Sequence, residues 1–439
     1  MKRRFLVLVV LLTTGLSYAQ QNVTVGEAVA AALQKNYDVR LQENLAATAY
    51  SDRKYAAVGV FLPTINGTGT YLKNSNKSKV INGLGQERTT PVTSTNTNGS
   101  VQLVWTLFDG TKMFATHKRL VETAELSELN VRNVMNNTVA LVINNYYNVV
   151  RQKQQLKAIR EQIGVAEERV KLAEKNLQVG TGRKPEYLQA KVDLNAFRTA
   201  ELSQQALISQ VKDQLNGLVG LTLPSVYETA DTIIIDMELT LDEIVTEIEG
   251  TNPTLIAARK AINVAQDAVW ESRALRSPVI NFVSSMNYQK TENSVAPSTN
   301  SNVYQRTQGF NYGLSVSLPI LNGLNITNVN NKARINIERQ KLIYDQQVMV
   351  ATVNARIAYA GYDIARKTLV IEEENILLAK ENVFIVLETF KRGIATAIEL
   401  RTAQQSLVDA YTRLIAARYN AKISETELLR LKGALLTNQ

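Results

Sequence analysis

The chain has 439 residues, of which 45% are hydrophobic and 20% charged, and this balance excludes an intrinsically disordered protein. Cysteine is absent and His117 is the single histidine, so disulfides, thiol catalysis and Cys- or His-rich metal sites are excluded, and we expect neither an enzyme nor a cofactor. The net charge of +9 is spread along the chain without a nucleic-acid-binding motif beside it, so nucleic acid is not an expected partner.

The first residues have the pattern of a secretory signal peptide. Lys2 to Arg4 are basic, Phe5 to Leu12 form an apolar run too short to span a bilayer, and Ser17 to Ala19 form a small-x-small cleavage site. We therefore predict a signal peptide at residues 1–19 and a mature chain that begins at Gln20. No later run reaches the roughly 18 apolar residues that a transmembrane helix needs, so any membrane contact is expected from β-strands.

Two halves of the chain repeat one pattern. Gly180 and Gly393 lie 213 positions apart (393 − 180), and the same spacing relates a series of further pairs. These pairs are Gly110 and Gly323, Tyr146 and Tyr359, Glu186 and Glu399, Ala190 and Ala403, Leu194 and Leu407, and Gly220 and Gly433. We predict a first repeat at residues 20–220, a connector at 221–240 and a second repeat at 241–439.

Each repeat is predicted to contain the same elements in the same order. It opens with a short amphipathic helix (Val25 to Gln34, or Leu241 to Glu249) and continues with a second helix (Val39 to Val60, or Thr254 to Ala274). Two strands around a polar loop follow, then a helix of about 70 residues, a turn and a helix of about 35 residues. In the connector, the β-branched run Thr232 to Ile235 predicts one small strand.

The long helices carry apolar residues at seven-residue spacing. In the first repeat the series is Val142, Val149, Leu156, Ile163, Val170 and Leu177, and in the last helix it is Leu400, Leu407, Leu414, Ala421 and Leu428. Small residues at companion positions, such as Ala403 and Ala410, let helices approach closely, so we predict coiled-coil-like packing. A helix of about 70 residues is roughly 100 Å long, which is the scale of a rod across the periplasm.

Four strand segments alternate between apolar and polar residues. They are about Pro63 to Lys73, Asn98 to Phe108, Pro278 to Gln289 and Gln308 to Leu318. In the last segment Phe310, Tyr312, Leu314, Val316 and Leu318 share one face, and Asn311, Gly313, Ser315 and Ser317 share the other. Segments of about ten residues with this pattern are typical of outer-membrane barrels. The intervening segments, Asn74 to Asn98 and Thr291 to Arg306, are rich in Ser, Thr and Asn and are predicted as extracellular loops.

Four strands cannot close a barrel, and an open sheet edge is not tolerated in lipid, so several chains are expected to share one barrel. Two chains would give eight strands, which is too narrow for a lumen, whereas three would give twelve, which is wide enough for a water-filled pore. The sequence therefore favours a homotrimer. The alternative is a periplasmic coiled-coil tethering protein without a pore, which has no need of alternating strands.

These features together resemble the TolC family of outer-membrane efflux proteins over nearly the whole mature chain. The residues that carry the resemblance are Leu62-Pro63 and Ser277-Pro278 before the first strand of each half, the junctions Leu107 to Gly110 and Ile320 to Gly323, and the turns Val179 to Ala190 and Arg392 to Ala403. The resemblance implies a mainly α-helical protein with a membrane β-barrel. Three chains would form a twelve-stranded barrel in the outer membrane and an α-helical barrel in the periplasm.

The resemblance also implies a function and partners. The protein would be the passive exit duct of a tripartite efflux or type I secretion system, with energy supplied by an inner-membrane pump. A periplasmic adaptor (membrane fusion) protein would dock at the two helical turns. The residues at these turns are Gly180, Thr181, Gly182 and Arg183 in the first half, and Arg392 and Gly393 in the second.

Some family members close the periplasmic tip with rings of aspartates. The equivalent positions, six and nine residues after each turn glycine, are Glu186 and Gln189 in the first half and Glu399 and Thr402 in the second, so one acid per half remains. Capping is the alternative role for both acids. Glu399 completes a capping box with Thr396, and Glu186 stands in the first turn of a helix, where the helix dipole favours a carboxylate.

Overall fold

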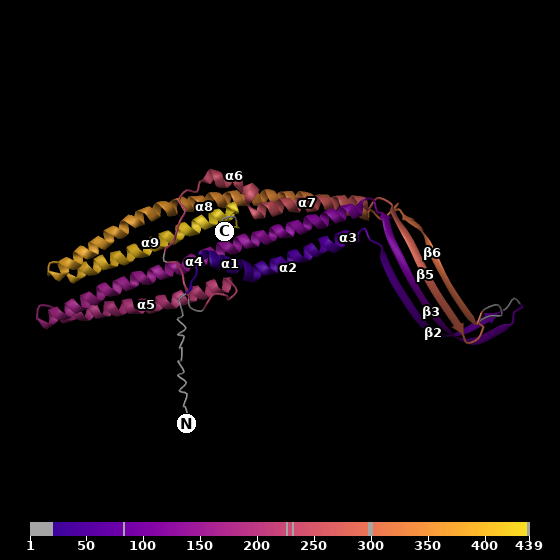
Figure 1. Ribbon diagram of the computed structural model, residues 1–439, viewed down its shortest axis with the longest axis horizontal. Helices are drawn as coiled ribbons and strands as arrows, with labels where there is room; N and C mark the ends of the chain where they lie inside the picture. Colours follow the sequence, from indigo (N-terminus) through magenta and orange to yellow (C-terminus); the bar gives the residue numbers. More distant parts are fainter. Residues whose placement is uncertain (1–20, 82–83, 225–226, 231, 297–301, 437–439) are drawn as a thin grey trace, which may run out of the picture. The chain divides into compact units, whose positions relative to one another are not determined.

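The computed structural model describes residues 21–81, 84–224, 227–230, 232–296 and 302–436. Most of these residues lie in helices, as Figure 1 shows. The strands form one four-stranded and one two-stranded sheet. The predicted signal peptide, residues 1–19, lies outside the described residues. None of the helices in the described ranges combines the length and apolar character that a bilayer span requires.

The two halves of the chain contain the predicted elements in the predicted order. The first half consists of β1 (Gln21–Asn22), α1 (Val25–Lys35), α2 (Tyr37–Ser51), η1 (Asp52–Ala56), α3 (Ala57–Gly59), β2 (Thr64–Ile81), β3 (Glu87–Phe108), α4 (Lys112–Gln178) and α5 (Lys184–Leu218). After β4 (Tyr227–Glu228), the second half consists of α6 (Leu241–Thr251), α7 (Pro253–Ala274), β5 (Val279–Asn293), β6 (Tyr304–Ser317), α8 (Asn325–Lys391), α9 (Ala397–Lys432) and η2 (Ala434–Leu436). The expected long helices are confirmed: α4 and α8 each have 67 residues, α5 has 35 and α9 has 36.

The second helix of the first half is not the single helix that was predicted from Val39 to Val60. A five-residue π-helical turn, η1, separates α2 from the short helix α3. A π-turn widens a single turn of a helix by one residue, and Val39 is the one buried residue of α2 and η1, so this segment carries too little apolar pattern for the shift to be visible in the sequence.

The strands of the four-stranded sheet are longer than predicted, because much of the two predicted polar loops is paired. Antiparallel pairing joins β2 to β3 from Thr64 opposite Val104 to Ile81 opposite Glu87, and it joins β5 to β6 as far as Glu292 opposite Tyr304. These outer segments are mostly polar on both faces, with isolated apolar residues such as Val92, so they carry no regular alternation that would identify a strand. Their threonines nevertheless favour extended backbone, and pairing begun in the apolar part extends into them.

The small strand predicted at Thr232 to Ile235 is wrong. The strand of the connector is β4, which pairs in parallel with β1 through Gln21 opposite Tyr227 and Asn22 opposite Glu228. Ile233 is buried and Ile235 is partly buried against the helical core, although neither lies in a strand. The β-branched run therefore reflects side-chain burial and not strand pairing.

Two compact units are described separately. The first comprises the described residues up to Gln42, those from Val131 to Pro253 and those from Val348 onward; the second comprises Glu43–Asn130 and Thr254–Gln347.

In the first unit the heptad series of α9 is confirmed, because Leu400, Leu407, Leu414, Ala421 and Leu428 are all buried. In α4 only Val142 and Val149 of the predicted series are fully buried, and the later members are half-buried.

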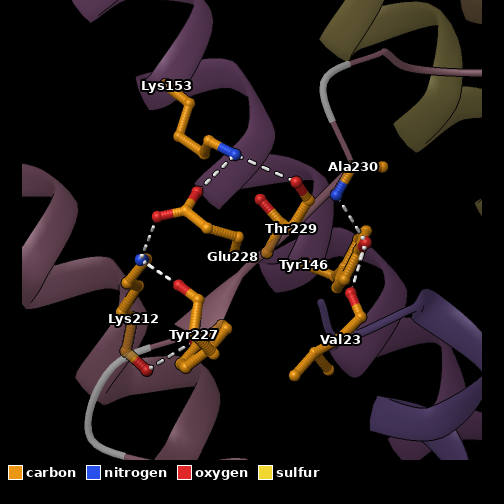
Figure 2. A network of polar contacts seen from close by, with 8 residues as sticks. All are labelled: Val23, Tyr146, Lys153, Lys212, Tyr227, Glu228, Thr229 and Ala230. Atoms are coloured by element: carbon orange, nitrogen blue, oxygen red, sulfur yellow. Dashed lines mark hydrogen bonds and ion pairs between the residues drawn. The ribbon is translucent and has the colours of Figure 1, made fainter. Parts of the chain in front are cut away.

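A polar network fixes the connector to the helices of the first unit (Figure 2). The buried hydroxyl of Tyr146 on α4 donates to the carbonyl of Val23 at 2.9 Å and accepts from the amide of Ala230 at 3.0 Å. Lys153 Nζ, also on α4, donates to the carbonyl of Thr229 at 2.9 Å. One helix thus holds both the N-terminal segment and the connector, which places β1 and β4 side by side.

The second unit contains the four-stranded sheet, in the order β2-β3-β5-β6 with every neighbouring pair antiparallel (Figure 1). Helices α4 and α7 of this unit are joined by ion pairs: Lys260 lies 2.5 Å from both Glu122 and Glu125, and Arg119 Nε lies 2.8 Å from Glu271. At the base of the sheet, the indole N–H of Trp105 donates to the carbonyl of Phe61 at 2.9 Å. The outer strands β2 and β6 each have one edge without a partner within the described chain.

Candidate functional site

The α4–α5 and α8–α9 turns end their first helices in the same way. Gly180 and Gly393 have φ values of 82° and 74°, in the left-handed region that glycine adopts without strain. In the first turn the amides of Gly180 and Thr181 donate to the carbonyls of Leu177 and Asn176. In the second, the amides of Gly393 and Ile394 donate to the carbonyls of Phe390 and Thr389. Both turns are therefore Schellman motifs, which satisfy the last carbonyls of the long helices.

The two turns differ in how the next helix begins. Thr396 caps α9: its hydroxyl accepts from the Glu399 amide at 3.2 Å, and its amide donates to the Glu399 carboxylate at 2.7 Å, as the sequence predicts. This hydrogen bond from the Thr396 amide lowers the pKa of the Glu399 carboxyl. Helix α5 has no side-chain cap at Arg183, and Pro185 stands in its first turn. Helix α9 thus begins with a side-chain cap that the start of α5 lacks.

The four predicted gate residues are all exposed, and the side chains of three of them make local contacts. Glu399 is held by its capping box, and the Thr402 hydroxyl donates to the carbonyl of Ile398 at 3.0 Å. Gln189 Nε2 donates to Asp193 Oδ1 at 2.8 Å. Within the described part of the chain, no hydrogen bond or ion pair joins any two of Glu186, Gln189, Glu399 and Thr402. The capping interpretation of Glu399 is confirmed, and its role in a gate remains a prediction.

An acid that the sequence analysis did not single out lies at the centre of a small polar cluster. Asp193 on α5 accepts from Gln189 and, through Oδ2, from Arg169 Nη1 of α4 at 2.8 Å. The Arg169 and Asp193 side chains are only 7% and 15% exposed. Arg401 of α9 approaches the same carboxylate at 3.9 Å, with its own side chain 62% exposed. Asp193 thus connects a predicted gate residue to the neighbouring helix and faces the second hairpin.

The sheet of the second unit has one continuous apolar face. Residues directly opposite one another in an antiparallel pair share a face, and the register aligns Trp105, Phe282 and Leu314 in one row. The neighbouring rows on this face hold Ile65, Leu103, Tyr312, Val101, Met286 and Phe310. Phe310 and Leu314 are 67% and 68% exposed. From Ile280 to Tyr288 the apolar band measures about 27 Å at roughly 3.4 Å per residue.

Beyond this band the same face becomes charged. The next rows hold Lys290 opposite Arg306 and Glu292 opposite Tyr304. The Arg306 guanidinium lies 5.4 Å from the centre of the Tyr288 ring, at the border between the two regions. The opposite face carries Thr68, Ser100 and Asn287, and the Thr68 and Ser100 hydroxyls are 2.8 Å apart. The predicted two-faced pattern of the strands is confirmed.

Helix α8 leaves a second apolar surface exposed, in the first unit. A series with seven-residue spacing runs along it and is between 46% and 65% exposed: Val350, Ile357, Ile364, Ile371, Leu378 and Ile385. The buried series of the same helix, Leu369, Ile376 and Val383, packs on α9. A helix with one heptad seam buried and another exposed has the pattern expected of a helix with a partner on each side.

Comparisons with known proteins agree with this arrangement. The profile of the family described as outer membrane efflux protein matches residues 18–221 and 244–434. The chain is 24% identical over 436 residues to the outer membrane efflux protein BepC of Brucella suis, covering 94% of this chain and 87% of that protein. It is 21% identical over 338 residues to the alkaline protease secretion protein AprF of Pseudomonas aeruginosa, covering 75% and 68%. The fold matches the CmeC outer membrane channel of Campylobacter jejuni with a TM-score of 0.75 at 16% identity, over 93% of this chain and 85% of that one.

Proposed function

This chain belongs to the outer membrane efflux protein family and is an exit duct of the outer membrane, and from that premise we propose that three copies build one duct. Each copy contributes four strands to a shared twelve-stranded barrel and four long helices to a helical barrel in the periplasm. The duct conducts passively, and an inner-membrane pump supplies the energy through a periplasmic adaptor protein.

The observation that carries this proposal is the exposed sheet with two free edges. The apolar band measures about 27 Å along the strands, which at a tilt of about 40° spans roughly 21 Å of membrane, near the height of about 25 Å that is typical of outer-membrane barrels. Because β2 and β6 run in opposite directions within one sheet, β6 of one copy can pair antiparallel with β2 of the next. Closure in this way leaves no edge in lipid and places the paired polar extensions outside the membrane.

The exposed seam of α8 supports the same assembly. An unpartnered row of isoleucine, leucine and valine along a long helix is expected to be covered by a helix of a neighbouring copy. Residues 20–220 and 241–439 then act as two repeats per chain, joined by the connector at 221–240.

The two helical turns are proposed as the periplasmic tip where the adaptor docks. Ile394 and Ile398 beside the second turn are 74% and 78% exposed, which is unusual for isoleucine and suits contact with a protein partner. Glu186, Gln189, Glu399 and Thr402 are proposed to line the narrow end of the duct. With one acid per half, this lining carries less negative charge than two full carboxylate rings would.

The first test is the oligomeric mass of the protein, extracted from outer membranes in mild detergent and measured by light scattering with the bound detergent subtracted. We expect the mass of three chains and, in planar bilayers, discrete conductance steps. A monomer that stays in solution without detergent would contradict the barrel and support the tethering protein.

A pair of substitutions on β6 tests which face meets lipid. Leu314→Arg places a charge on the apolar face and should cost about 2 kcal/mol or more per copy, so that assembly in the outer membrane is lost. Ser315→Arg is the matched control, because the adjacent residue points to the opposite face, and it should assemble normally. Equal amounts of both variants in the outer membrane, measured by fractionation, would refute the assignment of faces.

A further inference from the structure

The charged residues of the four-stranded sheet gather at one end and on one face. Helices α3 and α7 join the sheet at the end where the apolar band begins, and the charged rows lie at the other end, where β2 leads into β3 and β5 into β6 (Figure 1). By register, the charged side chains that the structure describes in these strands continue the rows of the apolar face: Lys73, Lys77, Lys79, Glu87, Lys290, Glu292 and Arg306. The face that meets lipid in the proposed barrel thus becomes charged where the apolar band ends.

The charge balance of the sheet is positive, and the sequence alone establishes it. Residues 61–108 and 278–318 contain two acids, Glu87 and Glu292, and six bases, so their net charge is +4 (6 − 2). The bases are Lys73, Lys77, Lys79, Arg88, Lys290 and Arg306, and the side chain of Arg88 lies outside the described part. Both acids are paired, Glu87 with Lys79 at 2.5 Å and Glu292 with Lys290 at 2.8 Å. Residues 82–83 and 297–301, which the structure does not describe, include no acid and so leave this balance unchanged.

Three of the cations on this face have no acidic partner within the described residues. Lys73 and Lys77 are exposed, and neither forms an ion pair there. Arg306 is also exposed; its guanidinium donates to the side-chain oxygen of Gln308 at 3.3 Å and lies 5.4 Å from the centre of the Tyr288 ring. A neutral amide and an aromatic ring do not cancel a positive charge, so these groups are available to an external anion.

Tyrosines mark the border between the apolar and the charged part of this face. Register places Tyr71 in the row of Lys290 and Arg306, and Tyr304 in the next row with Lys73. The two tyrosines are 69% and 53% exposed, and Lys290 Nζ lies 5.9 Å from the centre of the Tyr304 ring. Tyrosine is enriched where the hydrocarbon of a membrane meets the headgroups, so the cations beside these rings stand at headgroup level.

The opposite face of the same rows is neutral. One row holds Leu72, Asn96, Thr291 and Gln305, and the neighbouring row holds Thr70, Asn98, Gln289 and Thr307. Charges that serve only to solvate the outer end of the sheet are expected on both faces, since the lumen and the exterior are both aqueous. Their restriction to the outward face therefore favours a partner on the outside of the barrel.

We propose that this basic surface binds the phosphate-bearing headgroups of anionic lipids in the leaflet that surrounds the barrel. Its cations are Lys73, Lys77, Lys290 and Arg306. The inference rests on the proposed barrel, which decides that this face is the outward one. Lysine and arginine side chains reach from the end of an apolar surface to the headgroups, and phosphate oxygens accept hydrogen bonds from both. Because the basic surface continues the apolar band, one lipid can place its acyl chains on the band and its phosphate on the cations.

The test is native mass spectrometry of the full protein in an uncharged detergent, titrated separately with dioleoyl phosphatidic acid and dioleoyl phosphatidylcholine. The two lipids share their acyl chains and differ in the net charge of the headgroup. We expect the phosphatidic acid to bind about tenfold more tightly or better. Lys73→Gln combined with Arg306→Gln should weaken its binding about fivefold or more and leave the binding of phosphatidylcholine unchanged. Glycerol phosphate, which has the same phosphate and no acyl chains, should bind far more weakly than the lipid.

The matched control is Lys175→Gln combined with Arg356→Gln. It also removes one exposed lysine and one exposed arginine, from α4 and α8 in the first unit, and it should leave the affinity for phosphatidic acid unchanged. A trimer that binds the two lipids equally, the same affinity in both double variants, or glycerol phosphate bound as tightly as phosphatidic acid would overturn this inference and leave the proposed duct intact. A parent protein that stays monomeric in solution without detergent would overturn both.

Discussion

Asp193→Asn is the substitution that most directly tests what holds the candidate tip together. The carboxylate accepts from Arg169 at 2.8 Å and from Gln189 at 2.8 Å, and an asparagine retains the shape but not the charge. The Arg169 side chain is 7% exposed, so it would be left as a nearly buried cation without a counter-charge. Removing one member of a buried ion pair costs about 3 to 5 kcal/mol, and the lower end applies to a pair near the surface.

If the free energy of local opening falls by about 3 kcal/mol, the population of the opened helix end rises roughly 100-fold, because about 1.4 kcal/mol corresponds to a factor of ten. Hydrogen exchange measured by mass spectrometry reports this population segment by segment. We expect faster exchange in the peptides that cover the start of α5 and the end of α4, while the sheet exchanges as before.

Asp409→Asn is the matched control. Asp409 accepts from Gln405 at 2.9 Å, four residues earlier on the same helix, just as Asp193 accepts from Gln189. Asp409 is exposed, however, and within the described chain it has no arginine partner. Its substitution should change exchange by less than about threefold, because exposed polar pairs contribute little. If Asp193→Asn behaved like Asp409→Asn, the ion pair to Arg169 would not be what stabilises the tip.

Two further predictions concern the caps and turns. The capping hydrogen bond lowers the pKa of the Glu399 carboxyl, so the charged carboxylate stabilises the fold at any pH above 4.5, its usual pKa. This contribution is lost as the pH falls through the lowered pKa. The difference in thermal midpoint between the parent and Glu399→Gln should therefore be present at pH 7 and vanish in acid. Gly220→Ala should destabilise by about 1 to 2 kcal/mol or more in thermal denaturation, because φ is 70° there and a Cβ would lie 2.8 Å from the Lys35 carbonyl oxygen. Gly217→Ala, in the last turn of α5 with open space around it, should instead leave the stability equal or raise it by about 0.5 kcal/mol.

Much of the fold could be predicted because its signals are local or periodic. The turn glycines, the Thr396 cap and the seven-residue series of α9 each depend on residues within one or two helical turns, and the structure confirms them. The apolar face of β6 could be predicted for the same reason, since alternation is visible in a single strand.

The features that the sequence did not reveal depend on partners far along the chain. The polar ends of β2 and β3 extend because each strand has the other beside it, which composition alone does not show. The position of β4 follows from the contacts of Lys153 and Lys212 with the residues around it. Asp193 could not be identified as a site residue before the register of α4 against α5 was known, because 24 residues separate it from Arg169.

The duplication leaves the two hairpins similar in backbone and different in chemistry. At the spacing of 213 positions, Asp193 of the first hairpin corresponds to Ser406 of the second, and Arg401 corresponds to Leu188. The approach of Arg401 to Asp193 therefore has no counterpart at the equivalent positions, where a leucine would face a serine. In the proposed trimer, contacts within a chain at this level carry charge, whereas contacts between chains involve the exposed apolar seam of α8. Salt should accordingly weaken the contact between the hairpins of one chain and strengthen the association of chains, so that the two kinds of contact respond in opposite directions to the same change.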